Sequence, residues 1–297
     1  MHKSGFVNII GNPNVGKSTL LNNLVGARMS IITNKPQTTR HRILGILSDE
    51  DYQIVFSDTP GIILDPAYKM QTSMNKYVRS TFRDGDIMLL VTDTIETYEP
   101  DHPLLEKLSH LECPIFLIVN KIDLIEQKEV LELIMKWQKL LPNITETFPI
   151  SALKDKHGDK LITQILKHLP EGPAYYPKDQ LTDKNDRFIV SEIIREKVLE
   201  QFKQEIPYSV HVVTTEFKET KTNKKEPLIR IASTLFVMRE SQKAIILGNQ
   251  GFAIKRLATA ARKSMEAFFK QKVFLDITIK VKGNWRDDDK ALDNFGY

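Results

Sequence analysis

Residues 11–18 read GNPNVGKS and directly follow an apolar run over residues 7–10. This spacing matches GxxxxGK[ST], a strand-to-helix loop whose glycines let the backbone wrap a phosphate with its N–H groups pointing inward. Lys17 is expected to reach the β- and γ-phosphates, and the Ser18 hydroxyl to bind Mg²⁺. A chance glycine turn is disfavoured by the strand and helix on either side. The predicted phosphate-binding residues are Gly11, Asn12, Pro13, Asn14, Val15, Gly16, Lys17, Ser18, Thr19 and, from the next motif, Gly61.

A second motif, DTPG at residues 58–61, ends the strand-like run 53–57. An acidic residue at this end of a strand can hold Mg²⁺, so Asp58 is expected to do so through water. Gly61 offers an unhindered backbone N–H to the γ-phosphate. Taken alone, the segment could also be an ordinary turn, because Asp, Pro and Gly all favour turns. Thr59 and Pro60 complete a segment that is expected to switch with the nucleotide.

Two further segments, NKID at residues 120–123 and SAL at residues 151–153, predict guanine selectivity. The Asp123 carboxylate can accept hydrogen bonds from N1–H and N2–H₂ of guanine, and adenine presents no such pair of donors. This argues against a plain ATPase. Backbone N–H groups of SAL can face the guanine O6. The predicted guanine-binding residues are Asn120, Lys121, Asp123, Ser151, Ala152 and Leu153.

These motifs, in this order and spacing, resemble the translation-factor-related class of GTPases. Residues 37–41, QTTRH, resemble the effector loop of that class, whose threonine closes on Mg²⁺ and the γ-phosphate. Thr39 is favoured over Thr38 for that contact, giving a Mg²⁺ set of Ser18, Thr39 and Asp58; a polar connector after Pro36 is the alternative. The switch residues predicted in this loop are Gln37, Thr38, Thr39, Arg40 and His41.

The chain departs from the Ras-like pattern after Gly61, where Ile62 and Ile63 replace a water-orienting glutamine. An aliphatic side chain cannot orient or deprotonate water, so intrinsic turnover is expected to be slow. Asn14 resembles the asparagine that binds K⁺ near the phosphates in some relatives. The expected cofactors are therefore Mg²⁺ and, through this resemblance, K⁺.

The elements that must position these motifs are alternating strand-like and helical stretches. The strand-like runs are residues 7–10, 43–47, 53–57, 87–91, 115–120 and 147–150. Strand–helix alternation predicts an α/β domain with a mainly parallel sheet and helices on both faces. Only about five polar residues separate the second and third runs, so these two should form an antiparallel hairpin.

The second half of the chain has a different organisation. The order of its elements is helix, strand, strand, helix, helix, strand, which predicts a smaller α+β domain. The predicted divisions are a GTPase domain over residues 1–172, a proline-containing linker over 173–186, a nucleic-acid-binding domain over 187–283 and a C-terminal tail over 284–297.

Basic charge is concentrated in this second half. Residues 221–282 hold 14 basic and 4 acidic side chains, a net of +10. Such a block favours a polyanion through counterion release, although a solvated lysine-rich face is an equal alternative. Inside it, GNQG at residues 248–251 matches the GxxG loop that clamps about four nucleotides in KH domains. The predicted RNA-binding residues are Gly248, Asn249, Gln250, Gly251, Lys255 and Arg262.

One GTPase domain followed by a type II KH-like domain resembles the Era family of bacterial ribosome-assembly GTPases. Residues 37–41, 248–263 and the stretch NWRDD at 284–288 carry the resemblance. It implies binding of the 3′ end of 16S ribosomal RNA, a role in 30S subunit assembly and peripheral association with the inner membrane in some members. Asn249 and Gln250 depart from the lysine or extra glycine that relatives often carry. A GTP-dependent switch that binds a protein instead of RNA is the competing class.

Composition sets the remaining expectations. Apolar runs stay near five residues, far below the roughly 20 that cross a bilayer. The single cysteine, Cys113, cannot form an internal disulfide, which suits a reducing cytoplasm. The expected protein is a cytoplasmic monomer that binds GTP and GDP.

Overall fold

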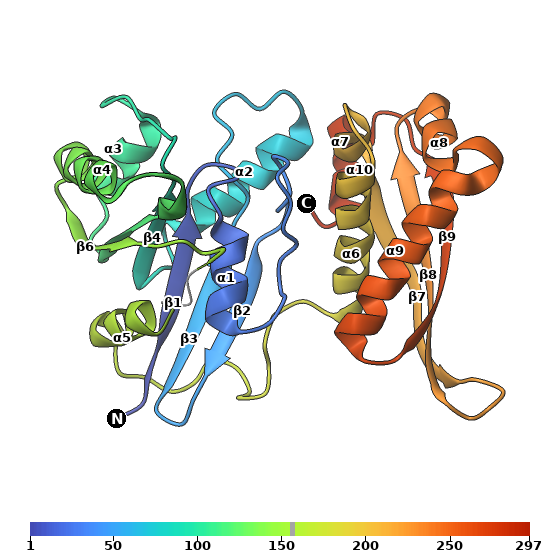
Figure 1. Cartoon of the computed structure of the whole chain (residues 1–297), viewed down its shortest axis with the longest axis horizontal. Coiled ribbons are helices and arrows are strands. Elements are labelled where there is room, and N and C mark those ends of the chain that lie inside the picture. The colour runs from blue at the N-terminus through green and yellow to red at the C-terminus, as the bar shows by residue number, and fades with distance from the viewer. Residues whose placement is uncertain (155–157) are drawn as a thin grey trace. The chain divides into compact units, whose positions relative to one another are not determined.

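The computed structural model of the chain describes residues 1–154 and 158–297 (Figure 1). It divides into two units, Met1–Asp65 with Met74–Asp183 and Pro66–Ser73 with Lys184–Tyr297. Each unit has a sheet and a hydrophobic core of its own. None of the helices in the described part of the chain combines the length and apolar character needed to cross a bilayer.

A six-stranded sheet forms the centre of the first unit, with the order β2-β3-β1-β4-β5-β6. Its strands are β1 (Lys3–Ile10), β2 (Ile43–Ser48), β3 (Tyr52–Asp58), β4 (Ile87–Thr92), β5 (Ile115–Val119) and β6 (Ile144–Pro149). Pairing is parallel except between β2 and β3, which form the expected antiparallel hairpin. The prediction of a mainly parallel α/β sheet is therefore confirmed.

Helices cover both faces of this sheet, because its strands are apolar on both sides. They are α1 (Lys17–Val25), α2 (Lys69–Thr81), α3 (Pro103–Ser109), α4 (Gln127–Leu140) and α5 (Gly158–His168), with a 3₁₀ turn at Ile122–Leu124. One core includes side chains of α1 and α5, and the other includes those of α3 and α4. The central strand β4 is buried along its whole length, so the loop that follows it is firmly anchored.

The second unit packs helices against a three-stranded sheet of order β7-β8-β9. Its elements are α6 (Asp186–Gln201), α7 (Ile206–Ser209), β7 (His211–Lys221), β8 (Pro227–Val237), α8 (Glu240–Leu247), a 3₁₀ turn at Asn249–Gly251, α9 (Phe252–Phe269), β9 (Lys272–Val281), a 3₁₀ turn at Trp285–Asp287 and α10 (Asp289–Asn294). β7 and β8 are antiparallel, whereas β8 and β9 are parallel. Apart from the short α7, the elements up to β9 follow the order expected of a type II KH domain.

Most of the segment predicted to link the two domains, residues 173–186, is attached to the first unit. The Ile46 N–H donates to the Leu181 carbonyl at 2.8 Å, and Gly45 forms a β-bridge with Thr182. The Gln53 amide donates to the Tyr176 carbonyl at 2.8 Å. The outer strand β2 has an open edge, and backbone groups of this segment pair with it.

The C-terminal tail is ordered around Trp285, which is fully buried in the second unit. Its indole N–H donates to the Ser209 carbonyl at 3.0 Å. The ring of Phe295, just after α10, lies edge-on to the indole. The tail is thus part of the domain core and not an appendage.

We predict that Trp285→Ala destabilises the protein by about 3–5 kcal/mol, because it removes a large buried ring and leaves a cavity. The free energy of unfolding from urea titration, followed by circular dichroism, measures the change. Ile245→Ala is the matched control, since Ile245 is 51% exposed on α8 and should cost little. Equal stability of Trp285→Ala and wild type would contradict the assignment of the tail to the core.

Candidate nucleotide site and GxxG loop

A cavity of about 440 Å³ in the first unit is bordered by all of the predicted nucleotide motifs. Sixteen predicted residues line it: Pro13, Asn14, Gly16, Lys17, Ser18, Thr19, Gln37, Thr38, Thr39, Gly61, Asn120, Lys121, Asp123, Ser151, Ala152 and Leu153. The predicted residues outside the lining are Gly11, Asn12, Val15, Arg40, His41, Asp58, Thr59 and Pro60. The sequence did not point to the other five lining residues, which are Ile31, Ile32, Thr33, Asn34 and Leu124.

The phosphate loop requires glycine at two positions for steric reasons. Gly11 has φ +143°, and a Cβ there would lie 2.1 Å from the Val91 carbonyl oxygen. Gly16 has φ +101°, and a Cβ there would lie 2.2 Å from the Asn120 amide nitrogen. The loop therefore lies directly against β4 and against the residue that follows β5, with no room for a side chain at either glycine.

Lys17 begins α1 and extends back along the loop. Its Nζ donates to the Gly11 carbonyl at 3.0 Å and the Asn12 carbonyl at 2.7 Å. Burial lowers the pKa of Lys17 to about 8, although the carboxylates of Asp58 and Glu96 oppose the shift. A bound phosphate would favour the charged ammonium and reverse the effect of burial.

Three of the predicted metal-binding side chains meet at one point. The Ser18 hydroxyl donates to Asp58 Oδ2 at 2.7 Å, and the hydroxyls of Ser18 and Thr39 are 2.9 Å apart. Asp58 Oδ1 is buried beside the Ser30 hydroxyl, but among the described residues no hydrogen bond of normal geometry satisfies it. Burial raises the pKa of the Asp58 carboxyl, while the charge of Lys17 opposes this. Hard oxygen ligands with one orphaned carboxylate oxygen suit Mg²⁺.

Thr38 and Thr39 point to different partners. Thr38 Oγ1 donates to the Lys35 carbonyl at 2.6 Å and lies 2.6 Å from the Thr33 hydroxyl. Thr39 Oγ1 instead lies 3.4 Å from Asp58 Oδ2. The structure therefore brings Thr39 to Ser18 and Asp58, whereas Thr38 bonds within its own loop.

The other switch residues divide between the cavity and the protein interior. Gly61 lies against the phosphate loop, since a Cβ there would be 2.5 Å from the Pro13 ring. The buried Thr59 hydroxyl donates to the Ile9 carbonyl at 2.9 Å, which ties the DTPG segment to β1. Arg40 is 1% exposed. The predicted switch segment therefore contains a buried cationic side chain.

Asn120 joins three loops at the guanine end of the cavity. Its amide donates to the Val15 carbonyl at 2.7 Å, and its Oδ1 accepts the N–H groups of Lys121 at 2.8 Å and Ala152 at 2.9 Å. The Ala152 N–H, expected to face guanine O6, serves the loop in this structure. Asn120 therefore braces the site.

The Asp123 carboxylate already has two protein partners. The Ser151 hydroxyl donates to Oδ1 at 2.6 Å, and the Lys154 ammonium lies 3.0 Å from Oδ2. The Ser151 hydrogen bond, followed by that of Lys154, lowers the pKa of Asp123. Lys154 is largely exposed, so a base can displace it at little cost. Ser151 was predicted to act through its backbone, and the hydrogen bond from its side-chain hydroxyl to Asp123 was not expected.

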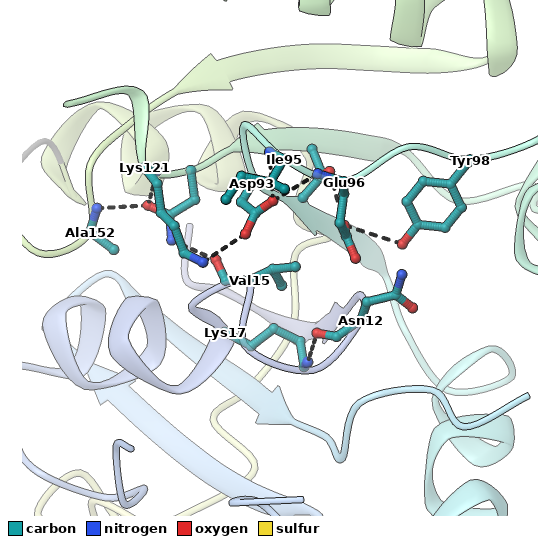
Figure 2. A network of polar contacts seen from close by, with 11 residues as sticks. Asn12, Val15, Lys17, Asp93, Ile95, Glu96, Tyr98, Lys121 and Ala152 are labelled. Atoms are coloured by element: carbon teal, nitrogen blue, oxygen red, sulfur yellow. Dashed lines mark hydrogen bonds and ion pairs between the residues drawn. The ribbon is translucent and has the colours of Figure 1, made fainter. Parts of the chain in front are cut away.

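Asp93 is a further site residue that sequence reasoning missed. It directly follows β4, and its Oδ2 lies 2.6 Å from the Lys121 ammonium, as Figure 2 shows. Burial alone would raise the pKa of Asp93, but the hydrogen bonds from Lys121 and from two backbone N–H groups lower it overall. An acidic residue just after a parallel strand was the signal that could have revealed it.

The GxxG segment in the second unit forms a tight turn between α8 and α9. Gly248 and Gly251 have φ +70° and +75°, and Gln250 has φ +50°. A Cβ at Gly248 would lie 2.6 Å from the Ala253 side chain. The turn presents the N-terminus of the 18-residue helix α9, whose partial positive charge attracts phosphate.

The two basic side chains expected beside this loop have different surroundings. Lys255 is exposed on the second turn of α9. Arg262 lies seven residues further along, with its guanidinium 2.7 Å from the Glu266 carboxylate. Part of the Arg262 charge is thus already neutralised, which spacing along a helix could not reveal.

Comparisons with known proteins give the same division of the chain. The family model described as "50S ribosome-binding GTPase" matches residues 6–121, and that described as "KH domain" matches residues 205–286. GTPase Era of Clostridium kluyveri is 43% identical, and the alignment covers all of both chains. Chloroplastic GTPase ERA1 of Zea mays is 45% identical over the whole of this chain and 71% of its own.

Two solved structures are similar over almost the full length. One is Era in complex with MgGDPNP and nucleotides 1506–1542 of 16S ribosomal RNA, with 37% identity, a TM-score of 0.92 and coverage of 100% of this chain and 99% of the other. The other is a point variant of Aquifex aeolicus Era bound to GDP and aluminium fluoride, with 36% identity, a TM-score of 0.91 and 99% coverage of both. The structural similarity to Era therefore covers both units of the chain.

We predict that Asp123→Asn weakens GTP binding by about a hundredfold or more, because it replaces one acceptor with a donor facing guanine. Xanthosine triphosphate should bind better to the variant, since its C2 carbonyl accepts that donor. Binding titrations of both nucleotides, with Lys154→Ala as a neighbouring control, measure the change. Unchanged GTP affinity in a folded Asp123→Asn protein would remove Asp123 from the base site.

Proposed function

The chain belongs to the Era family of GTPases, and from this we propose that it is a GTP-hydrolysing switch that binds single-stranded RNA during assembly of the small ribosomal subunit. One observation supports the proposal: the same chain carries a cavity bordered by all of the guanine-nucleotide motifs and a basic domain with a GxxG turn. A relative that is similar across the full length was solved with a GTP analogue and a 16S rRNA fragment. We propose the 3′ end of 16S rRNA as the ligand and the 30S subunit as the partner.

The metal proposed for this site is Mg²⁺, held by Ser18, Thr39 and Asp58. Their convergence and the orphaned Asp58 Oδ1 fit the ion. When bound, it would neutralise charge on the phosphates. The surrounding residues do the rest: Lys17 binds phosphate oxygens, and the inward-facing backbone of the loop orients them.

Hydrolysis by this site is expected to be slow without a further activator. Ile62 is partly buried against the core, and Asn75 fixes the next residue by accepting from and donating to the Ile63 backbone at 3.2 and 2.7 Å. Neither isoleucine can accept a proton from water. The attacking water must therefore be oriented by backbone groups or by a cation.

The setting we propose is the cytoplasm, with the protein acting as a monomer and associating peripherally with the inner membrane. The single free cysteine fits a reducing compartment. Fractionation and sedimentation of the native protein test this proposal.

We predict that KCl supports faster GTP hydrolysis than matched NaCl, by about threefold or more, because a cation beside the phosphates neutralises developing charge. Asn14 lines the cavity with φ +69° and is proposed to hold K⁺ through its side-chain carbonyl. Turnover is measured in both salts, with Mg²⁺ present, for wild type and Asn14→Ala. The variant should lose the preference. Equal wild-type rates in the two salts would eliminate the potassium site.

We predict that changing Asn249 and Gln250 together to aspartate weakens RNA binding by about tenfold or more, because two negative charges then stand where phosphate binds. GTP affinity should not change. Fluorescence anisotropy on an RNA with the 3′-terminal 16S sequence, at two salt concentrations, measures the effect. Wild-type affinity should fall steeply with salt.

A matched control separates this local effect from net charge. Gln127→Glu with Gln138→Glu adds the same two charges on exposed positions of α4 in the first unit. It should bind RNA like wild type. RNA affinity equal to wild type in the aspartate double variant would refute the role of the GxxG loop. Absence of RNA binding in wild type would favour the protein-binding alternative.

A further inference from the structure

The loop between β4 and α3, residues 93–102, contacts both ends of the nucleotide site. At the guanine end, Asp93 holds the Lys121 ammonium. Its other oxygen, Oδ1, accepts the backbone N–H groups of Ile95 and Glu96 at 3.0 Å each. These bonds turn the chain back toward the phosphate loop and bring Glu96 and Tyr98 over Asn12 (Figure 2).

Glu96 is the carboxylate that faces the phosphate loop from this turn. Its Oε2 accepts the Thr92 hydroxyl at 3.0 Å and lies 3.4 Å from the Tyr98 hydroxyl. The side-chain amide of Asn12 faces the same carboxylate and lies close enough to influence its pKa (Figure 2). Burial raises the pKa of Glu96, while its hydrogen bonds and the charge of Lys17 oppose the shift.

Tyr98 lies beside the backbone of the same loop residue. Its hydroxyl is close enough to the Asn12 backbone to be influenced by it, and the residue is only 4% exposed. The ring packs 5.0 Å from Trp137 and 4.7 Å from His102, measured between centroids. The hydroxyl is therefore placed by the hydrophobic core, and Asn12 faces Glu96 with its side chain and Tyr98 with its backbone.

Asn12 in turn positions the lysine that binds phosphate. Its carbonyl accepts the Lys17 ammonium at 2.7 Å, the shorter of the two hydrogen bonds that this lysine makes to the loop. A shift of the Asn12 peptide would move the ammonium with it. The contacts lead from the core through Tyr98 and Asn12 to Lys17. Tyr98 lies outside all of the nucleotide motifs.

We propose that Glu96 and Tyr98 form a clamp on Asn12 and are positioning residues for GTP hydrolysis, acting through Lys17. Both touch the outer side of the loop, and neither lines the nucleotide cavity. The clamp keeps the ammonium where negative charge develops on the transferring phosphoryl group. A loosened clamp still leaves the loop's N–H groups and the base site to bind GTP.

This division predicts that the clamp affects kcat more than KM. Misplacing a preorganised charge by a fraction of an ångström weakens an interaction that matters most in the transition state. Tyr98→Phe removes only the hydroxyl and keeps the packed ring. We expect it to lower kcat by about threefold to thirtyfold with a KM for GTP within about twofold of wild type.

Substitutions at Glu96 test the hydrogen bonds separately from the charge. Glu96→Ala removes every contact of the carboxylate and should lower kcat as Tyr98→Phe does. Glu96→Gln can still accept the Thr92 hydroxyl and bond to a rotated Asn12 amide, so it should restore kcat to near the wild-type value. Glu99→Ala is the matched control, because Glu99 is an exposed carboxylate in the same loop.

The experiment is steady-state GTP hydrolysis by the full-length protein of each variant, with circular dichroism melts to confirm folding. It needs no RNA, so its result is independent of the RNA-binding proposal. Lowered kcat in Tyr98→Phe and Glu96→Ala, with rescue by Glu96→Gln and no effect of Glu99→Ala, supports the clamp. Wild-type kcat in Tyr98→Phe and Glu96→Ala, or an equal loss in Glu99→Ala, overturns it.

Discussion

The parallel pairing of the first sheet is the constraint on which the site depends. β1 pairs in parallel with β3 and β4, and the pairing continues through β5 to β6. Strands that run in one direction deliver the loops after them to one edge, where ligands of such folds bind. The residues that follow these strands or end them there are Gly11, Asp58, Asp93, Asn120 and Ser151. A ligand as highly charged as GTP can be held because dipoles and side chains from five strands meet.

Charge at this edge is balanced within the protein before GTP arrives. Lys17 is buried and faces the carboxylates of Asp58 and Glu96, so its positive charge is partly satisfied already. Lys17 and the N–H groups of the loop are then available to the incoming phosphates, and two glycines and Asn120 hold that loop in shape. This arrangement costs little reorganisation on binding, since the donors are fixed by packing.

The two units rely on different physics. The nucleotide cavity is concave and lined in part by buried polar residues. The GxxG turn is more exposed, and it precedes a helix N-terminus within a stretch of the chain that is rich in basic side chains. GTP recognition should therefore depend on geometry, whereas RNA recognition should depend strongly on salt.

The sequence by itself determined the fold class, the nucleotide motifs and the family, because glycine turns, strand periodicity and the NKID motif act through local backbone geometry. It also identified Gly248, whose φ of +70° and contact with Ala253 leave no room for a side chain. Tertiary structure decided the rest. It brought Thr39, and not Thr38, to Asp58, and it paired Arg262 with Glu266. It also brought Glu96 and Tyr98 to Asn12 across more than eighty residues of chain, because contacts between distant segments depend on how the sheet closes and leave no periodic pattern in the sequence.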